Sequence, residues 1–172
     1  AVLLMLNALV EGKEVLISRG EQVEIGGSFR IPDVIKKSGC KMIEVGTTNK
    51  THLQDYKNGI TPNTGAILVA HTSNYKVMGF TESVKLSELC ALAKKKKITL
   101  ILDLGSGAIA NFQKLGLPHE PQVQSYLKSG ANVVSFSGDK LLGGPQSGIM
   151  VGNSDIITQL KKHPLARAMR AD

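Results

Sequence analysis

The segment Ile98-Thr-Leu-Ile-Leu-Asp-Leu-Gly-Ser-Gly107 is an apolar run that ends in an aspartate and a glycine-rich turn. Its lack of polar alternation is typical of a strand buried on both faces of a sheet. Similar runs alternate with helix-like segments along the chain, which predicts an α/β fold, a three-layer sandwich around a mostly parallel sheet. The predicted strands are Glu14–Ser18, Lys41–Val45, Ala66–Ala70, Ile98–Asp103, Asn132–Phe136 and Gly148–Val151.

The helical segments between these strands give right-handed crossovers in a parallel sheet. The last pair of strands is different, because the residues from Lys140 to Ser147 are too few for a crossover helix. The final strand is therefore predicted to be antiparallel. Ser154 is expected to cap the last long helix, and Pro164 to open another. The predicted helices are Ile31–Ser38, Leu53–Asn58, Val84–Lys97, Gln122–Ser129 and Asp155–Lys162, and the apolar N-terminal segment is also helix-periodic.

Composition indicates a soluble globular domain. The 172 residues are 42% hydrophobic and 20% charged, and they contain no Trp to form a stacking platform for single-stranded nucleic acid. The net charge of +7 is dispersed, and its densest run, Lys94–Lys97, closes a predicted helix where cations complement the dipole. Cys40 and Cys90 are typical of reduced thiols in a cytoplasmic protein. No apolar run reaches the roughly 18 residues that span a membrane.

Both ends of the sequence lie in or beside helical patterns. The first residues already belong to a helix-periodic segment, and Ala171 and Asp172 directly follow a basic helical segment. We therefore expect these residues to be the interior of a longer protein.

Small, polar or ionisable residues follow each of the first five predicted strands. In an open parallel sheet the carboxyl ends of the strands meet at one edge, where ligands bind. Polar residues are common in loops after strands, but this tendency does not explain a histidine, an aspartate and a lysine after three successive strands. The segments are Ser18-Arg-Gly-Glu21, Gly46-Thr-Thr-Asn49, His71-Thr-Ser-Asn74, Asp103-Leu-Gly-Ser-Gly107 and Ser137-Gly-Asp-Lys140.

Lys140 is the strongest single candidate for chemistry. It follows the apolar run Val133–Phe136 and precedes Gly143 and Gly144. A lysine is most often a solvated surface charge. Among small residues at a strand end, this one is instead placed to form a Schiff base with an aldehyde cofactor whose ring lies close to the backbone.

The other candidates fit pyridoxal phosphate, which needs a carboxylate for its pyridine nitrogen, a group against the ring and phosphate donors. Asp103 supplies the carboxylate, although a helix cap, a turn residue or a Mg²⁺ ligand are alternatives. His71 can stack on the ring or contact substrate, or be a structural histidine. Asn74 can bond the phenolic oxygen or only form a turn. Ser137 can donate to the phosphate. No metal is predicted.

Seven motifs together resemble the bacterial selenocysteine synthases, the L-seryl-tRNA(Sec) selenium transferases. These are pyridoxal-phosphate enzymes of the aspartate aminotransferase fold (fold type I), and the resemblance covers nearly the whole chain. The motifs are Ser18-Arg-Gly-Glu21, Val23-Glu-Ile-Gly-Gly-Ser-Phe-Arg-Ile-Pro-Asp-Val34, Glu44-Val-Gly-Thr-Thr-Asn-Lys-Thr-His-Leu53, His71-Thr-Ser-Asn-Tyr75, Asp103-Leu-Gly-Ser-Gly107, Phe136-Ser-Gly-Asp-Lys-Leu-Leu-Gly-Gly-Pro-Gln146 and His163-Pro-Leu-Ala-Arg-Ala-Met-Arg170.

The resemblance implies roles for matching residues. Lys140 would carry the cofactor and move protons, and Asp103 would pair with the pyridine nitrogen. Asp139 resembles a family residue near the reacting centre. Arg167 and Arg170 match arginines that bind the selenophosphate anion, a role that suits guanidinium groups three residues apart on one helix face; from the residues alone, a solvated face is the alternative.

The implied reaction replaces the seryl hydroxyl of L-seryl-tRNA(Sec) with selenium from selenophosphate. Arg19, in the first motif, is also predicted to bind substrate. Residues 1–172 would be the cofactor-binding large domain, without the family's N-terminal tRNA-binding domain and C-terminal small domain, and the family forms rings of dimers. This piece is therefore expected to be a homo-oligomer component with no membrane partner, and the resemblance does not imply activity of the piece alone.

Two other functions remain open. A paralogue of the same fold would eliminate water or ammonia from an amino acid or an amino sugar phosphate. A non-catalytic module would hold Mg²⁺ through Asp103 and a nucleotide phosphate at Gly143 and Gly144. The module is disfavoured because the chain has no Gly-x-x-x-x-Gly-Lys-Ser/Thr motif and no helix signal directly after these glycines.

Overall fold

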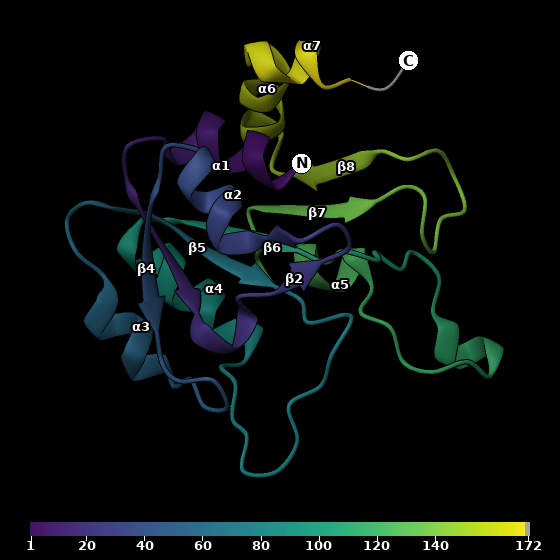
Figure 1. Cartoon of the computed structure of the whole chain (residues 1–172), viewed down its shortest axis with the longest axis horizontal. Coiled ribbons are helices and arrows are strands. Elements are labelled where there is room, and N and C mark those ends of the chain that lie inside the picture. Colours follow the sequence, from purple (N-terminus) through teal and green to yellow (C-terminus); the bar gives the residue numbers. More distant parts are fainter. Residues whose placement is uncertain (171–172) are drawn as a thin grey trace.

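The computed structural model describes residues 1–170. Its centre is a six-stranded sheet with the strand order β4-β1-β5-β6-β7-β8. The first five of these strands are mutually parallel, and β8 pairs antiparallel with β7. Helices cover both faces, so the predicted three-layer α/β fold is confirmed (Figure 1). The strands are β1 (Glu14–Ser18), β4 (Lys41–Val45), β5 (Thr64–Ala70), β6 (Thr99–Asp103), β7 (Val133–Ser137) and β8 (Gly148–Gly152).

The two faces of the sheet bury alternate residues of each strand, as a period of two requires. On one face, Val15 and Ile17 of β1 pack in a cluster with α1, α2 and α6. On the other face, Leu16 packs with α3, α4 and α5. The helices are α1 (Val2–Val10), α2 (Ile31–Lys37), α3 (Leu53–Gly59), α4 (Leu86–Lys96), α5 (Val123–Lys128), α6 (Ser154–Lys162) and α7 (Pro164–Ala168).

Predicted helix ends differ from the observed ones by one or two residues, because caps decide where helices begin and end. α4 starts at Leu86 rather than Val84, since Lys85 is the N-cap and its N–H donates to Glu88 Oε2. It ends where Lys97 turns left-handed at φ 57°. The expected capping by Ser154 is wrong: Asn153 is the N-cap residue, and Ser154 is the first residue of α6.

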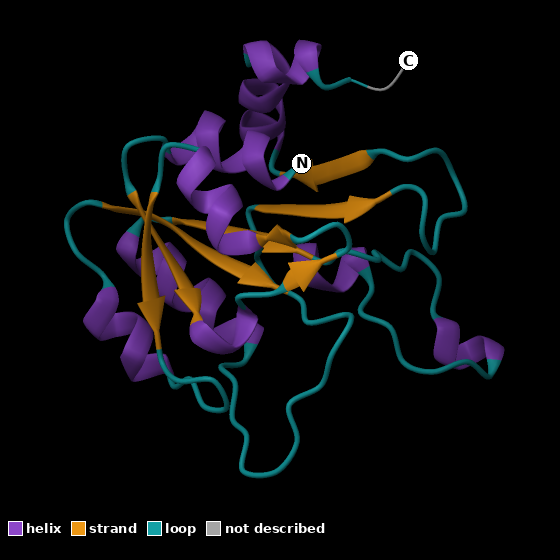
Figure 2. Cartoon of the chain, viewed as in Figure 1, coloured by secondary structure: helices purple, strands orange, loops and turns teal. Residues whose placement is uncertain are grey.

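A two-stranded hairpin was not predicted. It is formed by β2 (Glu24–Ile25) and β3 (Phe29–Arg30), and the short 3₁₀ helices η1 (Arg19–Glu21) and η2 (Phe112–Leu115) were also missed. Two long loops leave the sheet, one between β5 and α4 and one between β6 and α5 (Figure 2). No helix within residues 1–170 is long and apolar enough to cross a membrane.

Candidate functional site

The carboxyl ends of the parallel strands lie at one edge of the sheet, as the sequence predicts. Register places Ala70 of β5 beside Asp103 of β6, and Asp103 beside Ser135 of β7. Three neighbouring strands therefore present these residues at the same level. Ligands of open parallel sheets bind outside this edge.

Asp103 is the central carboxyl group of this edge. Its Oδ1 accepts a hydrogen bond of 2.8 Å from Ser135 Oγ. Desolvation by burial raises the pKa of Asp103, although the hydrogen bonds from Ser135 and from the Gly105 backbone, and the charge of Lys140, oppose this rise. An ionised Asp103 is therefore costly until a cation lies against it.

Lys140 lies in a turn after β7 whose backbone is held by Gly143 N–H, which donates to Lys140 O at 2.9 Å. The residue is exposed and does not pack among the small residues at the strand end. Lys140 lies beyond the end of β7, but its Nζ lies close to Gly105 and Ser73. A Cβ on Gly105 would lie 3.9 Å from Lys140 Nζ and 3.4 Å from Ser73 Oγ.

Gly105 therefore leaves room between the lysine and the β5 loop. It adopts φ +64°, a left-handed conformation that glycine reaches without strain. A side chain here would occupy the space that Lys140 Nζ and Ser73 Oγ face. Close approach of a flat ligand to the backbone is a common reason for such a glycine.

His71 joins the same edge from the end of β5. Its backbone N–H donates to Asp103 O at 2.8 Å. Its Nδ1 is buried and has no hydrogen-bond partner among the described residues. A buried ring nitrogen without a partner is destabilising, so a polar ligand atom at this position would be stabilised.

The structure places the remaining predicted cofactor residues as follows. Ser137 is the last residue of β7, and its backbone N–H donates to Gly105 O at 2.9 Å. Asn74 turns toward the hairpin, where its Nδ2 donates to Glu24 O at 2.9 Å. Asp139 is exposed beside Lys140. Ser137 and Asp139 are thus next to the site, whereas the Asn74 amide is engaged elsewhere.

The three predicted arginines lie near the two ends of the chain, Arg19 at the start of η1 and Arg167 and Arg170 in and after α7. Arg19 pairs with Glu44, its Nε donating to Oε1 at 2.7 Å. Arg167 lies in α7, which ends at Ala168, so Arg170 lies beyond the helix and the expected shared helical face does not form. Both residues are exposed. α7 follows α6, which begins beside the amino end of β7, where Asn153 N–H donates to Asn132 O.

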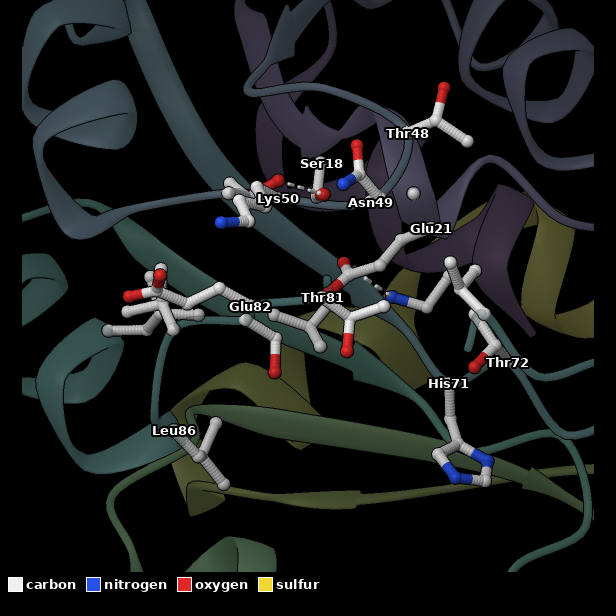
Figure 3. A pocket seen from close by; sticks show the side chains of 18 of the residues that line it. Ser18, Glu21, Thr48, Asn49, Lys50, His71, Thr72, Thr81, Glu82 and Leu86 are labelled. Atoms are coloured by element: carbon white, nitrogen blue, oxygen red, sulfur yellow. Dashed lines mark hydrogen bonds between the residues drawn. The ribbon is translucent and has the colours of Figure 1, made fainter. Parts of the chain in front are cut away.

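A cavity of about 480 Å³ opens beside this site, between the ends of β1, β4 and β5 and the segment that leads into α4. His71 belongs to both the cavity and the Asp103 side, whereas Lys140 and Asp103 do not line it. Figure 3 shows Glu21, Asn49 and His71 around the cavity. Within residues 1–170, no group of three or more His, Cys, Asp or Glu side chains could hold a metal ion.

Glu21 is the most unusual group in this cavity. Its Oε2 accepts the backbone N–H of Ala70 at 3.3 Å. Desolvation raises the pKa of Glu21 to about 8, and the Ala70 N–H only partly opposes this rise. The carboxyl group is therefore protonated at neutral pH.

Sequence reasoning missed the roles of Glu21, Ser73, Gly105 and Ser135. Ser135 had a signal, since it is a single hydroxyl inside the apolar run of β7 and is fully buried. Ser73 and Gly105 lie in segments that were recognised as strand ends without a role being assigned. Glu21 lies in the strand-end segment Ser18-Arg-Gly-Glu21 as well, but only the fold brings its carboxyl group against Ala70.

Two similar curated relatives carry the same name. The chain is 58% identical to an L-seryl-tRNA(Sec) selenium transferase of Alkaliphilus metalliredigens (strain QYMF) and 55% identical to one of Alkaliphilus oremlandii (strain OhILAs). Each match covers 100% of this chain and 37% of the relative. The chain thus spans little more than a third of the length of these proteins.

Solved structures share the fold. D-glucosaminate-6-phosphate ammonia-lyase superposes with a TM-score of 0.79 at 22% identity, covering 99% of this chain and 46% of that one. Thermus thermophilus aspartate aminotransferase with maleate gives 0.70 at 18% identity, over 99% and 43%. The fold is therefore that of the aspartate aminotransferase type. The family model described as L-seryl-tRNA selenium transferase matches residues 1–172, and the chain belongs to that family.

Proposed function

We propose that this chain is the cofactor-binding large domain of an enzyme that converts L-seryl-tRNA(Sec) to L-selenocysteinyl-tRNA(Sec) with selenophosphate. Family membership across residues 1–172 supports the reaction. The observation that carries the assignment of the site is the position of Asp103 at the end of β6 and of Lys140 after the neighbouring β7, close enough for the charge of Lys140 to act on Asp103, with Lys140 Nζ beside Gly105. Of the predicted domain, residues 171–172 lie outside the described part of the chain.

The residues at this edge fit pyridoxal phosphate. Asp103 is a buried carboxyl group that lacks a strong cationic partner, which a protonated pyridine nitrogen would supply. The unpartnered His71 Nδ1 and the open space over Gly105 fit a planar, polar ligand. Lys140 would hold the aldehyde, Asp103 the ring nitrogen and His71 the ring or substrate, with Ser137 near the phosphate. The predicted bond from Asn74 to the phenolic oxygen would require its amide to leave Glu24 O. When bound, the cofactor withdraws electrons from the substrate α carbon.

The chain's own residues then have separate tasks. Lys140 takes a proton from the substrate α carbon and later returns it, as an amine with a freely turning side chain can. Ser135 donates to Asp103 Oδ1 and so fixes the direction of the carboxylate. Asp139, next to Lys140 in the same turn, would act near the reacting group, as the family motif implies.

Selenophosphate would bind through Arg167 and Arg170, whose guanidinium groups suit phosphate geometry. Both are exposed and lie in and just after α7, and we propose that another subunit or domain completes the donor site around them. Homo-oligomerisation as in the family would provide that. Alanine at either position should weaken donor use by about tenfold to a hundredfold, measured as turnover against selenophosphate concentration; an unchanged donor dependence in both variants would make them surface charges.

Selenium incorporation tests the function. In a full-length transferase that contains these residues, Lys140→Ala should abolish selenocysteinyl-tRNA(Sec) formation and the cofactor's visible absorbance. Lys76→Ala is the matched control, because Lys76 is an exposed lysine in the loop after β5, and it should keep both. Activity of the Lys140→Ala variant equal to that of the control would overturn the assignment.

Elimination of ammonia or water from a small molecule remains the second candidate. The likeness to D-glucosaminate-6-phosphate ammonia-lyase is at 22% identity and concerns the fold alone. The sequence relatives favour selenium transfer, and turnover of the intact enzyme with a small amino sugar phosphate but not with L-seryl-tRNA(Sec) would reverse that preference.

A further inference from the structure

The cavity of about 480 Å³ is not used by the cofactor residues Lys140 and Asp103. Its volume lies in the range of about 300–1,000 Å³ that suits small organic ligands. Its lining is of two kinds. The apolar lining residues, here called the floor, include Val69, Val84, Leu86, Leu89, Leu102 and Leu104. The hydroxyl and amide lining residues, here called the rim, include Ser18, Thr47, Thr48, Asn49, Thr72 and Thr81.

This division suits a nucleoside. A purine ring is flat and largely apolar on its faces, so it can lie on the floor, while ribose hydroxyl groups can bond to the rim. The charged groups of the rim are few, and Glu82 is paired with His52 at 3.2 Å. A cavity with little net charge favours an uncharged nucleoside over a bare phosphate.

Glu21 supplies the specific contact. One of its oxygens is fixed by the Ala70 N–H, and as a neutral acid the group offers both a donor and an acceptor. Asn and Gln side chains recognise adenine by this same pair of a donor and an acceptor. Glu21 can thus bond to the edge of an adenine ring that lies on the floor.

The cavity adjoins the space beside Lys140, so one substrate can reach both. His71 and Thr72 line the cavity, and Ser73, the next residue, faces the space beside Lys140. In an aminoacyl-tRNA the amino acid is esterified to the terminal ribose, so the ribose oxygen lies only about 4 Å from the carbon that bears the seryl hydroxyl. The terminal ribose must therefore lie directly beside the reacting seryl group.

We propose that the cavity binds the terminal adenosine of the aminoacyl-tRNA substrate, with the purine on the apolar floor and Glu21 bonded to its edge. The inference rests on the proposed function, since it names where that substrate's last nucleotide is held.

Binding should depend on the protonation of Glu21. Ionisation removes the donor and introduces a negative charge against the ring, so affinity falls as pH rises above about 8. The titratable groups that face Glu21 or line its cavity are Tyr56 of α3, Tyr75 of the β5 loop, Tyr126 of α5, His71, Lys50 and Glu82. Burial raises the pKa of all three tyrosines, so they stay neutral in this range.

The test measures the dissociation constant of a hydrolysis-resistant probe, 3′-seryl-amino-3′-deoxyadenosine, for a full-length transferase by calorimetry. The wild type should bind it at neutral pH and lose about tenfold in affinity one pH unit above the pKa of Glu21. Glu21→Gln keeps a donor and an acceptor at every pH, so it should bind throughout. Glu21→Ala should bind at least about tenfold more weakly at neutral pH.

Glu11→Gln is the matched control, because Glu11 is exposed and follows α1 at the other edge of the sheet. It should keep the wild-type affinity and pH dependence. Unchanged affinity in Glu21→Ala, or wild-type affinity that does not fall above pH 8, would overturn the inference. The proposed function has a separate test: a cofactor that does not bind at Lys140 would contradict the proposed function. Probe affinity can be measured whether or not the cofactor is bound.

Discussion

The two ends of β1 carry glutamates in opposite states. At the amino end, Glu14 accepts hydrogen bonds from Thr61 and from Lys41, the latter at 3.2 Å, and these contacts lower its pKa. Beyond the carboxyl end, Glu21 is held only by the Ala70 N–H, and desolvation raises its pKa to about 8. The amino edge thus pairs its charges within the chain.

Asp103, at the carboxyl end of β6, resembles Glu21 rather than Glu14. Its pKa is also raised by desolvation, with a serine and a backbone N–H as its hydrogen-bond donors. Carboxyl groups that are unsatisfied on folding destabilise the protein, and such groups concentrate at functional sites. The comparison indicates that ionised Glu14 stabilises the fold through contacts within the chain, whereas neither Glu21 nor Asp103 forms an ion pair within residues 1–170. Glu44, also near the carboxyl edge, differs from both because it pairs with Arg19.

Asp103→Asn should produce the largest effect that tests this comparison. An amide cannot keep a pyridine nitrogen protonated, so turnover of the full-length enzyme should fall by about 100-fold or more, while the lysine adduct still forms. Near-normal turnover would show that the raised pKa of Asp103 has no functional meaning. Absorbance and selenium incorporation, measured on one preparation, separate the two steps.

Glu21→Gln should change stability with a definite sign. The unfolded carboxyl group loses its proton near 4.5 and the folded one near 8, so the wild-type free energy of unfolding falls as pH rises between these values. Glutamine removes that slope. Above about pH 8 the variant should be more stable than the wild type by about 1–3 kcal/mol, a range reduced because Glu21 is partly exposed. Urea unfolding at several pH values measures the free energy of unfolding of both proteins. If this free energy depended on pH equally in the wild type and in Glu21→Gln, the prediction would be refuted.

Ser135→Ala should have a smaller effect on catalysis. The variant removes one hydrogen bond to Asp103 Oδ1 without adding bulk, so turnover should fall by about tenfold. The pKa of Asp103 should rise further, which would shift the acid limb of the pH–rate profile to higher pH. A profile that coincides with the wild type would show that Ser135 only packs.

Glu14→Gln should affect stability alone. Its lowered pKa means that ionised Glu14 stabilises the fold at neutral pH and that this contribution is lost as the pH falls below the ordinary glutamate range. The variant should melt at a lower temperature at neutral pH and show less acid sensitivity, with unchanged catalysis. If Glu14→Gln were fully folded but had impaired turnover, the proposed difference between the amino and carboxyl edges would be wrong.

The sequence was sufficient for the fold because buried strands and crossover helices leave strong patterns. Each predicted strand is present, and the short Lys140–Ser147 connection correctly predicts that β8 is antiparallel. The hairpin of β2 and β3 was missed because strands of two residues have no periodicity. Helix ends were displaced because backbone caps, such as the one at Lys97, depend on conformation.

The site was only partly predictable. Strand-end chemistry identified His71, Asp103 and Lys140, and the fold brings all three to one edge, although their roles remain predictions. The desolvation of Glu21 and the hydrogen bond from Ser135 depend on tertiary packing, which no local pattern encodes. Arg167 and Arg170 were expected on one helix face, but α7 ends too early for that.

The most direct test of the account is covalent trapping at the carboxyl edge. Pyridoxal phosphate is added to the full-length enzyme, the adduct is reduced with borohydride, and peptides are mapped by mass spectrometry. The account predicts label on Lys140, in the peptide that contains Ser137 and Asp139, and none at the amino edge on Lys41. Label on Lys41, Lys76 or another lysine in place of Lys140 would contradict it.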